Sequence, residues 1–172
     1  MSEAAGVVVL IGRILFAFWF GAVTGIGHFK RDQMMRGYAQ QAGFPVPALA
    51  GWVAGLWLIL GAVSVAFGIW PDLGALMIGA FVIPAALFFH RYWSIEDEMQ
   101  KMSQSQLFYR NLIILGASIV FFGTFVSLGS ELRFAITAPF FDSEPGRRLR
   151  CQVNRKRNPP MRKADEQHET TG

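Results

Sequence analysis

The stretch that decides the fold is residues 47–89, PALAGWVAGLWLILGAVSVAFGIW-PD-LGALMIGAFVIPAALFF, in which Asp72 is the only charged residue. It contains two apolar runs, 47–70 and 73–89, separated by Pro71-Asp72. A bilayer core about 30 Å thick needs about 20 helical residues. The runs lack the alternation of polar and apolar residues that is typical of membrane barrel strands. We therefore predict two antiparallel membrane-spanning helices joined by a tight turn.

Two further apolar runs lie on either side of this pair. Residues 6–27 are apolar except for Arg13, and residues 111–129 contain no charged residue. Four such runs predict an all-α integral membrane four-helix bundle over residues 1–130. A secretory signal peptide is the alternative for the first run, but the run is longer than the apolar region of a signal and no basic residue precedes it.

The composition argues against a soluble protein. Apolar residues make up 52% of the chain and charged residues 16%, whereas an average globular domain has about 25% charged residues. Beyond the fourth run, residues 131–141 hold Arg133 among apolar neighbours, and we predict an interfacial segment there. Residues 142–172 contain eight Lys/Arg and five Asp/Glu, which predicts a disordered basic tail.

The tail and the cysteine count exclude several functions. The basic tail could contact anionic lipid. Binding to nucleic acid is not expected, because no folded reading element accompanies the basic residues. The single cysteine, Cys151, excludes an internal disulfide and a Cys-x-x-Cys redox motif.

Four spans place both termini on one side of the membrane and the loops 28–46 and 90–110 on the other. His28, His90 and Asn111 should then lie at one membrane face, where we expect any polar site. Six Lys/Arg in the two loops favour cytoplasmic loops. The basic tail favours cytoplasmic termini, because it resists export and is attracted to anionic lipid. We favour cytoplasmic termini.

Arg13 and Asn111 are candidates to organise polar contacts. A charge at mid-membrane costs about 2.5–3.5 kcal/mol on insertion scales, so Arg13 needs an explanation. It either extends to the headgroups, as long basic side chains do, or has a structural or functional partner. The other three predicted spans contain no Asp or Glu, so we expect no ion pair within the membrane core.

The histidines and tryptophans suggest contacts at the membrane surface. His28 and His90 could contact a quinone or ligate haem. Two histidines without further ligand spacing do not predict a metal site, and haem is the less favoured cofactor. Trp52, Trp70 and Trp93 lie near predicted span ends, where tryptophan commonly anchors a helix at the interface.

Small residues and a proline shape the predicted bundle. Gly21 and Gly25, and likewise Gly51 and Gly55, form small-x-x-x-small pairs that let helices approach closely, which favours packing within the bundle over dimerisation. Pro84 should bend the third helix and free a carbonyl near residue 80. This bend could border a cavity.

Several short motifs then resemble a known family. They are GRIL at 12–15, GIGHF at 25–29, GFPVP at 43–47, AGL at 54–56, FHRYW at 89–93 and LFYRNL at 107–112. Their order and spacing resemble the DoxX family of small bacterial and archaeal membrane proteins. Two positions depart from the family pattern: Leu58 stands where members often carry Glu, and His28 where they often carry Lys.

The resemblance implies a four-span bundle in the plasma (inner) membrane. It also implies an accessory subunit of a redox or quinone-linked complex, with oxidoreductase or respiratory subunits as partners and no catalytic activity of its own. One alternative is a carrier or binding protein for a small hydrophobic molecule, with a cavity near Pro84. Another is an oxidoreductase that itself binds quinone or haem.

Overall fold

The structure is a computed structural model that describes residues 2–141. Within that range the regular elements are all helical, as predicted. They are α1 (Glu3–Phe18), the π-helical η1 (Trp19–Gly25), α2 (Ile26–Lys30), α3 (Asp32–Gln41), the 3-10 turn η2 (Pro47–Ala50), α4 (Trp52–Phe67), α5 (Pro71–Pro84), the π-helical η3 (Ala85–Phe89), the 3-10 turn η4 (Tyr92–Ser94), α6 (Glu98–Leu128) and the 3-10 turn η5 (Gly129–Glu131). The predicted disordered tail, 142–172, lies outside the described residues.

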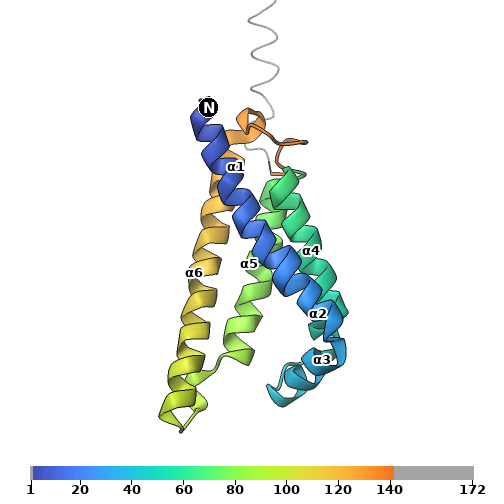
Figure 1. Cartoon of the computed structure of the whole chain (residues 1–172), viewed down its shortest axis with the longest axis vertical. Coiled ribbons are helices and arrows are strands. Elements are labelled where there is room, and N and C mark those ends of the chain that lie inside the picture. The colour runs from blue at the N-terminus through green and yellow to red at the C-terminus, as the bar shows by residue number, and fades with distance from the viewer. Residues whose placement is uncertain (1, 142–172) are drawn as a thin grey trace, which may run out of the picture. The chain divides into compact units, whose positions relative to one another are not determined.

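The helices form a four-membered bundle. Figure 1 shows α1, η1 and α2 as one continuous rod, and this rod packs along α4. Helix α5 packs against both α4 and α6. Three helical stretches of the described chain are long and apolar enough to cross a membrane: Glu3–Lys30, Pro71–Ser94 and Glu98–Glu131. The fourth, α4, is equally apolar but has only 16 residues, about 24 Å of helix.

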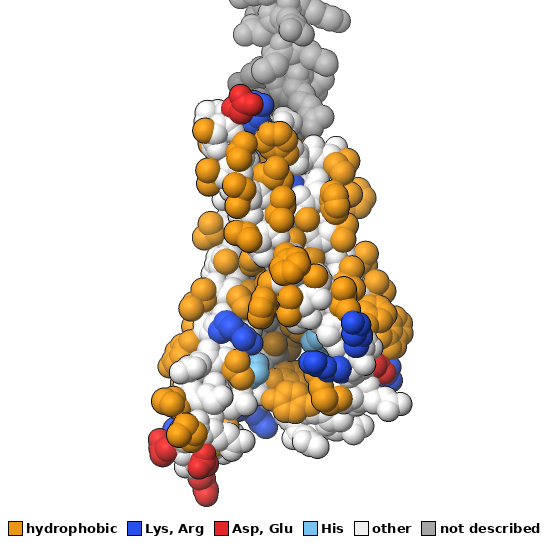
Figure 2. All heavy atoms as spheres, viewed as in Figure 1, with side chains coloured by type: hydrophobic (Ala, Val, Ile, Leu, Met, Phe, Trp, Pro, Cys, Tyr) orange, Lys and Arg blue, Asp and Glu red, His pale blue; other side chains and the backbone are white. Residues whose placement is uncertain are grey.

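The surface of the bundle is apolar. Val8 is 69% exposed, Ile113 73% and Val120 68%. Figure 2 shows apolar side chains covering most of this face of the helices, with charged groups gathered toward the ends. Such a surface would be unfavourable in water and is compatible with lipid. The chain is therefore a membrane protein, with lipid as the solvent of its outer face.

Two predicted boundaries are wrong. The turn between α4 and α5 is Gly68–Trp70, and Pro71-Asp72 instead begins α5. Gly68 ends α4 with a φ of +67°, the left-handed conformation that glycine adopts most easily after a helix. Proline suits the first helical position, because the amide that it lacks would have no partner in the helix there.

The second correction concerns loop 90–110. The sequence predicted a loop there, but residues 98–110 are the first turns of α6 itself. Asp97 caps this helix by accepting a hydrogen bond from the Gln100 amide at 2.7 Å. With 31 residues, α6 is about 46 Å long, which exceeds the bilayer core by about 16 Å. Its polar N-terminal part therefore extends beyond the membrane.

Small residues bring the first rod against α4. A Cβ atom at Gly55 would lie 2.8 Å from the carbonyl oxygen of Gly25, so both backbones need glycine at this crossing. This is the predicted use of these glycines within the bundle. Around it lies an apolar core that includes the fully buried Leu58, Ile78 and Phe125.

Among residues 2–141, Arg13 is the one buried cation, with an exposure of 0%. Its Nε donates to the carbonyl of Val65 at 2.8 Å, and its Nη2 to that of Ala66 at 3.0 Å. Both carbonyls belong to the last turn of α4, where helical carbonyls lack partners and the helix dipole is negative. Nη1 donates to the carbonyls of Phe134 and Arg133 at 3.3 and 3.4 Å. The guanidinium therefore points into the protein and not toward headgroups.

Segment 131–141 folds back on the α4–α5 turn. The Thr137 amide donates to the Gly68 carbonyl at 3.0 Å, and the Trp70 amide donates to the Thr137 hydroxyl at 2.8 Å. The buried carboxylate of Asp72 accepts from the amides of Phe140 and Phe141 at 2.8 and 2.7 Å. The segment is therefore bound to the bundle, while its position at the membrane interface stays a prediction.

We expect Arg13→Ala to lower the free energy of unfolding by at least about 2 kcal/mol, because buried carbonyls lose charged donors. Arg13→Lys should restore only part of the loss, since an ammonium group lacks the fork of a guanidinium. Thermal unfolding in detergent micelles measures both changes. Arg31→Ala, at an exposed position, is the matched control. Equal melting temperatures for the Arg13 and Arg31 variants would contradict the stabilising role of the Arg13 hydrogen bonds.

Candidate functional site

One pocket of about 430 Å³ opens at the end of the bundle away from segment 131–141. Its walls come from η1, α2, α3, η2, α4, α5, η3 and α6. Most of the lining is apolar and aromatic, and includes Trp19, Phe20, Phe44, Val53, Trp57 and Phe81. The polar lining residues are Thr24, His28, Tyr38, His90, Arg110 and Asn111. Figure 2 shows a hollow in the lower part of the bundle, with histidine and basic side chains around it.

Both π-helical segments border this pocket. Trp19 and Thr24 come from η1, whereas Ala85 and Phe89 come from η3. The Thr24 hydroxyl donates to the Trp19 carbonyl, five residues earlier, at 3.2 Å. Such segments are rare and frequently mark functional sites. Pro84, immediately before η3, is a sequence signal for that segment, whereas no comparable residue in the sequence indicates η1.

The pocket brings together three of the four polar candidates. His28, His90 and Asn111 all line it, although they are far apart in sequence. Arg13 does not, because it binds the C-terminal end of α4. Leu58, at the position where family members often carry Glu, is buried in the apolar core and is not among the lining residues.

The predicted interface anchors lie outside the pocket lining. Trp52, Trp70 and Trp93 are 46%, 50% and 54% exposed. Trp70 has a φ of +47° in the α4–α5 turn, an uncommon conformation for a bulky residue. The hydrogen bond from the Trp70 amide to the Thr137 hydroxyl helps to hold that turn. Anchoring at the membrane surface stays a prediction for all three.

Each pocket histidine is oriented by a hydrogen bond. The Nδ1 of His28 donates to the Ala50 carbonyl at 2.6 Å, since a carbonyl only accepts. The His28 ring also lies edge-on to Phe81, with ring centroids 5.6 Å apart. The Nδ1 of His90 is 2.9 Å from the Gln104 side-chain oxygen. Within residues 2–141, no three His, Cys, Asp or Glu residues group together as metal ligands.

Asn111 is the polar lining residue with a buried hydrogen-bond donor that has no acceptor among the described residues. It is 7% exposed, and its Nδ2 finds no hydrogen-bond partner in the part of the chain that the structure describes. A buried donor without a partner costs about 1–3 kcal/mol. The other buried unpartnered side-chain atom of the described residues, Ser118 Oγ, is not in the pocket lining. The unpartnered amide therefore points to a missing acceptor in the pocket.

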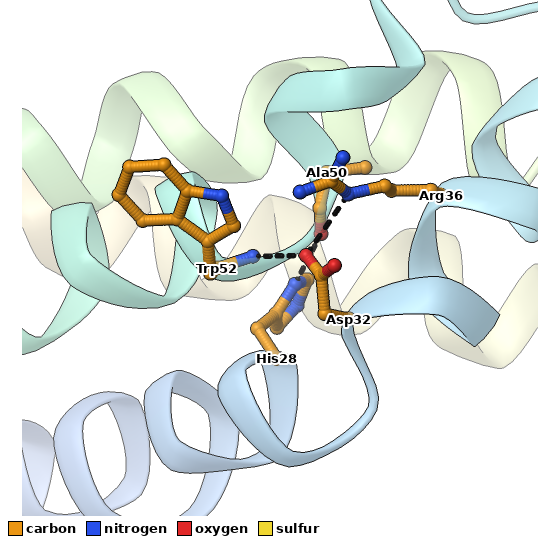
Figure 3. A network of polar contacts seen from close by, with 5 residues as sticks. All are labelled: His28, Asp32, Arg36, Ala50 and Trp52. Atoms are coloured by element: carbon orange, nitrogen blue, oxygen red, sulfur yellow. Dashed lines mark hydrogen bonds and ion pairs between the residues drawn. The ribbon is translucent and has the colours of Figure 1, made fainter.

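Asp32 holds one wall of the pocket in place (Figure 3). Its Oδ1 accepts from the Trp52 amide at 2.8 Å, which caps the start of α4, and from Arg36 Nε at 3.0 Å. A Cβ on Gly51 would overlap this carboxylate, so glycine is needed there. Together with the His28–Ala50 bond, these contacts fix the turn η2, from which Ala50 lines the pocket.

Asp32 was not among the site residues predicted from the sequence. The available signal was that Asp32 is the only acidic residue of loop 28–46. Donation from the Trp52 amide, with a contribution from Arg36, holds the pKa of the Asp32 carboxyl below its ordinary value of 3.8. The carboxylate is therefore ionised at neutral pH, when it complements the positive end of the α4 dipole.

The fold and the pocket together define a class: a helical membrane protein with a mostly apolar internal pocket. Residues 8–91 match the model of the DoxX family. The match confirms the resemblance to the DoxX family over these residues, and the apolar helices identify the chain as a membrane protein. No curated protein and no solved structure matched the chain. The matched range contains His28 and His90, whereas Arg110 and Asn111 follow it on α6.

The lowered pKa of Asp32 predicts a pH-dependent contribution to stability. The contribution is complete above the unfolded pKa, near 4, and disappears as the pH falls through the lower folded pKa. The melting temperature of the wild type should therefore exceed that of Asp32→Asn at neutral pH, and this difference should shrink below about pH 4. Glu96→Gln, at an exposed position, is the control. A difference that stays constant with pH would contradict the role assigned to Asp32.

Proposed function

We propose that this protein binds a small, largely apolar molecule in its pocket, as a carrier or binding protein within the membrane. The observation that carries the proposal is the unpartnered Asn111 amide in a pocket that is otherwise mainly apolar and aromatic. Ligand sites of this kind combine apolar walls with a few well-placed polar groups. The volume of about 430 Å³ lies within the usual range for small-molecule sites.

The same donor supports a second, redox-linked proposal. The carbonyl of a quinone is an acceptor that would fit the Asn111 amide, with His28 and the aromatic residues orienting the ring. A bound quinone would supply two-electron redox chemistry. On this proposal the protein acts as an accessory subunit of a quinone-linked complex in the plasma membrane, as the family resemblance implies. Both termini are then cytoplasmic, as the basic tail favours.

A pocket-filling variant tests the main proposal. Ala54 lines the pocket, so Ala54→Phe should occupy space that a ligand needs. The wild type purified in mild detergent should release a small molecule on solvent extraction, and the variant should release much less, as measured by mass spectrometry.

Val120→Phe adds the same ring on the exposed, lipid-facing side of α6, and it should retain the molecule. Melting temperatures would show that both variants are folded. Equal release from the two phenylalanine variants, or none from the wild type, would count against ligand binding in this pocket.

A further inference from the structure

The polar end of the pocket is positively charged. Arg110 lines it and is exposed at its edge, next in sequence to the buried Asn111. Arg110 interacts electrostatically with His90 and forms no ion pair within residues 2–141. No Asp or Glu is among the lining residues. This end of the pocket thus offers hydrogen-bond donors and an uncompensated cation.

Polarity falls along one face of α6 toward the bundle interior. Arg110 is a charged group at the edge, Asn111 a buried amide and Ile114 an apolar side chain, and all three line the pocket. Arg110 and Ile114 are four residues apart, about 6 Å along the helix, and lie on the same side of it. A molecule with a polar head and an apolar tail would match this order.

The size of the pocket limits the tail. At about 30 Å³ for each water-sized group, 430 Å³ holds about fourteen such groups. A single chain of about twelve carbons would fill this volume.

We propose that the ligand is a single-chain carboxylate of the fatty-acid class. Its carboxylate accepts hydrogen bonds from Arg110 and the Asn111 amide, and its tail lies along Phe20, Val53 and Trp57. This inference rests on the proposed function, because it specifies the molecule that the pocket binds. An anion at this position accepts a hydrogen bond from the buried Asn111 amide and also neutralises the charge of Arg110.

The test compares radiolabelled dodecanoic acid with radiolabelled methyl dodecanoate. The ester keeps the chain and the carbonyl acceptor but lacks the charge. Binding is measured to protein in lipid nanodiscs, with empty nanodiscs subtracted. We expect the acid to bind about tenfold more tightly than the ester. Arg110→Gln should remove about that factor for the acid and change ester binding by about twofold or less, whereas Asn111→Ala should weaken both, because the ester carbonyl also accepts from the amide.

Lys101→Gln removes a charge from the same helix outside the pocket and should leave acid binding unchanged. Equal binding of acid and ester would overturn the carboxylate inference and leave the proposed function standing, with a neutral acceptor as head group. Binding of neither, in wild type that melts normally and releases no small molecule on solvent extraction, would instead overturn the proposed function. Arg110 is exposed, so Arg110→Gln tests the charge even if Asn111→Ala fails to fold.

Discussion

The hydrogen bonds from Arg13 to the last carbonyls of α4 are the interaction on which the bundle depends. They satisfy acceptors that would otherwise be buried without a partner at the end of a short helix, and they join α4 to segment 131–141. Hydrogen bonds to a charged group contribute about 1.5–3 kcal/mol each, so they offset the cost of placing a cation in the membrane. At the other end of α4, Asp32 caps the first amide. The two ends of the α4 dipole thus meet opposite charges, both supplied by the N-terminal part of the chain.

This arrangement explains how the pocket is built. Because α4 is held at both ends, the first rod and α4 stay in register over their whole contact, including the close approach of Gly25 and Gly55. The π-helical segment η1, which contains Gly25, interrupts the first rod, and η3 follows α5. The pocket lies where these interruptions meet α6, at the end where Asp32 and His28 fix the turn η2.

Much of the fold was predictable, because hydropathy reports directly on which segments lie in lipid. The four helices, the close packing at Gly25 and Gly55 and the importance of Arg13 all followed from residue type and spacing. The boundaries at Pro71 and at residues 98–110 did not, because turn and helix differ there in backbone conformation and not in polarity. Parity of the spans grouped His28, His90 and Asn111. The partners of Arg13 were not predictable, since every residue has a carbonyl and only the tertiary structure shows which ones lack a donor. The missing acceptor of the Asn111 amide could not be predicted for the same reason, since only the tertiary structure shows which donors lack a partner.

The long sequence separation of the Arg13 contacts has a consequence for biosynthesis. Two of its acceptors, the carbonyls of Arg133 and Phe134, lie 120 and 121 positions further along the chain. At roughly 5–20 residues per second, about 6–24 s separate the synthesis of the donor from that of these acceptors. During this interval the first helix lies in the bilayer before the carbonyls of Arg133 and Phe134 exist. The Arg13 side chain can then extend toward the lipid headgroups, as long basic side chains do. Assembly is then completed when the chain after α6 returns to the arginine, so the first helix to enter the membrane is among the last to be secured.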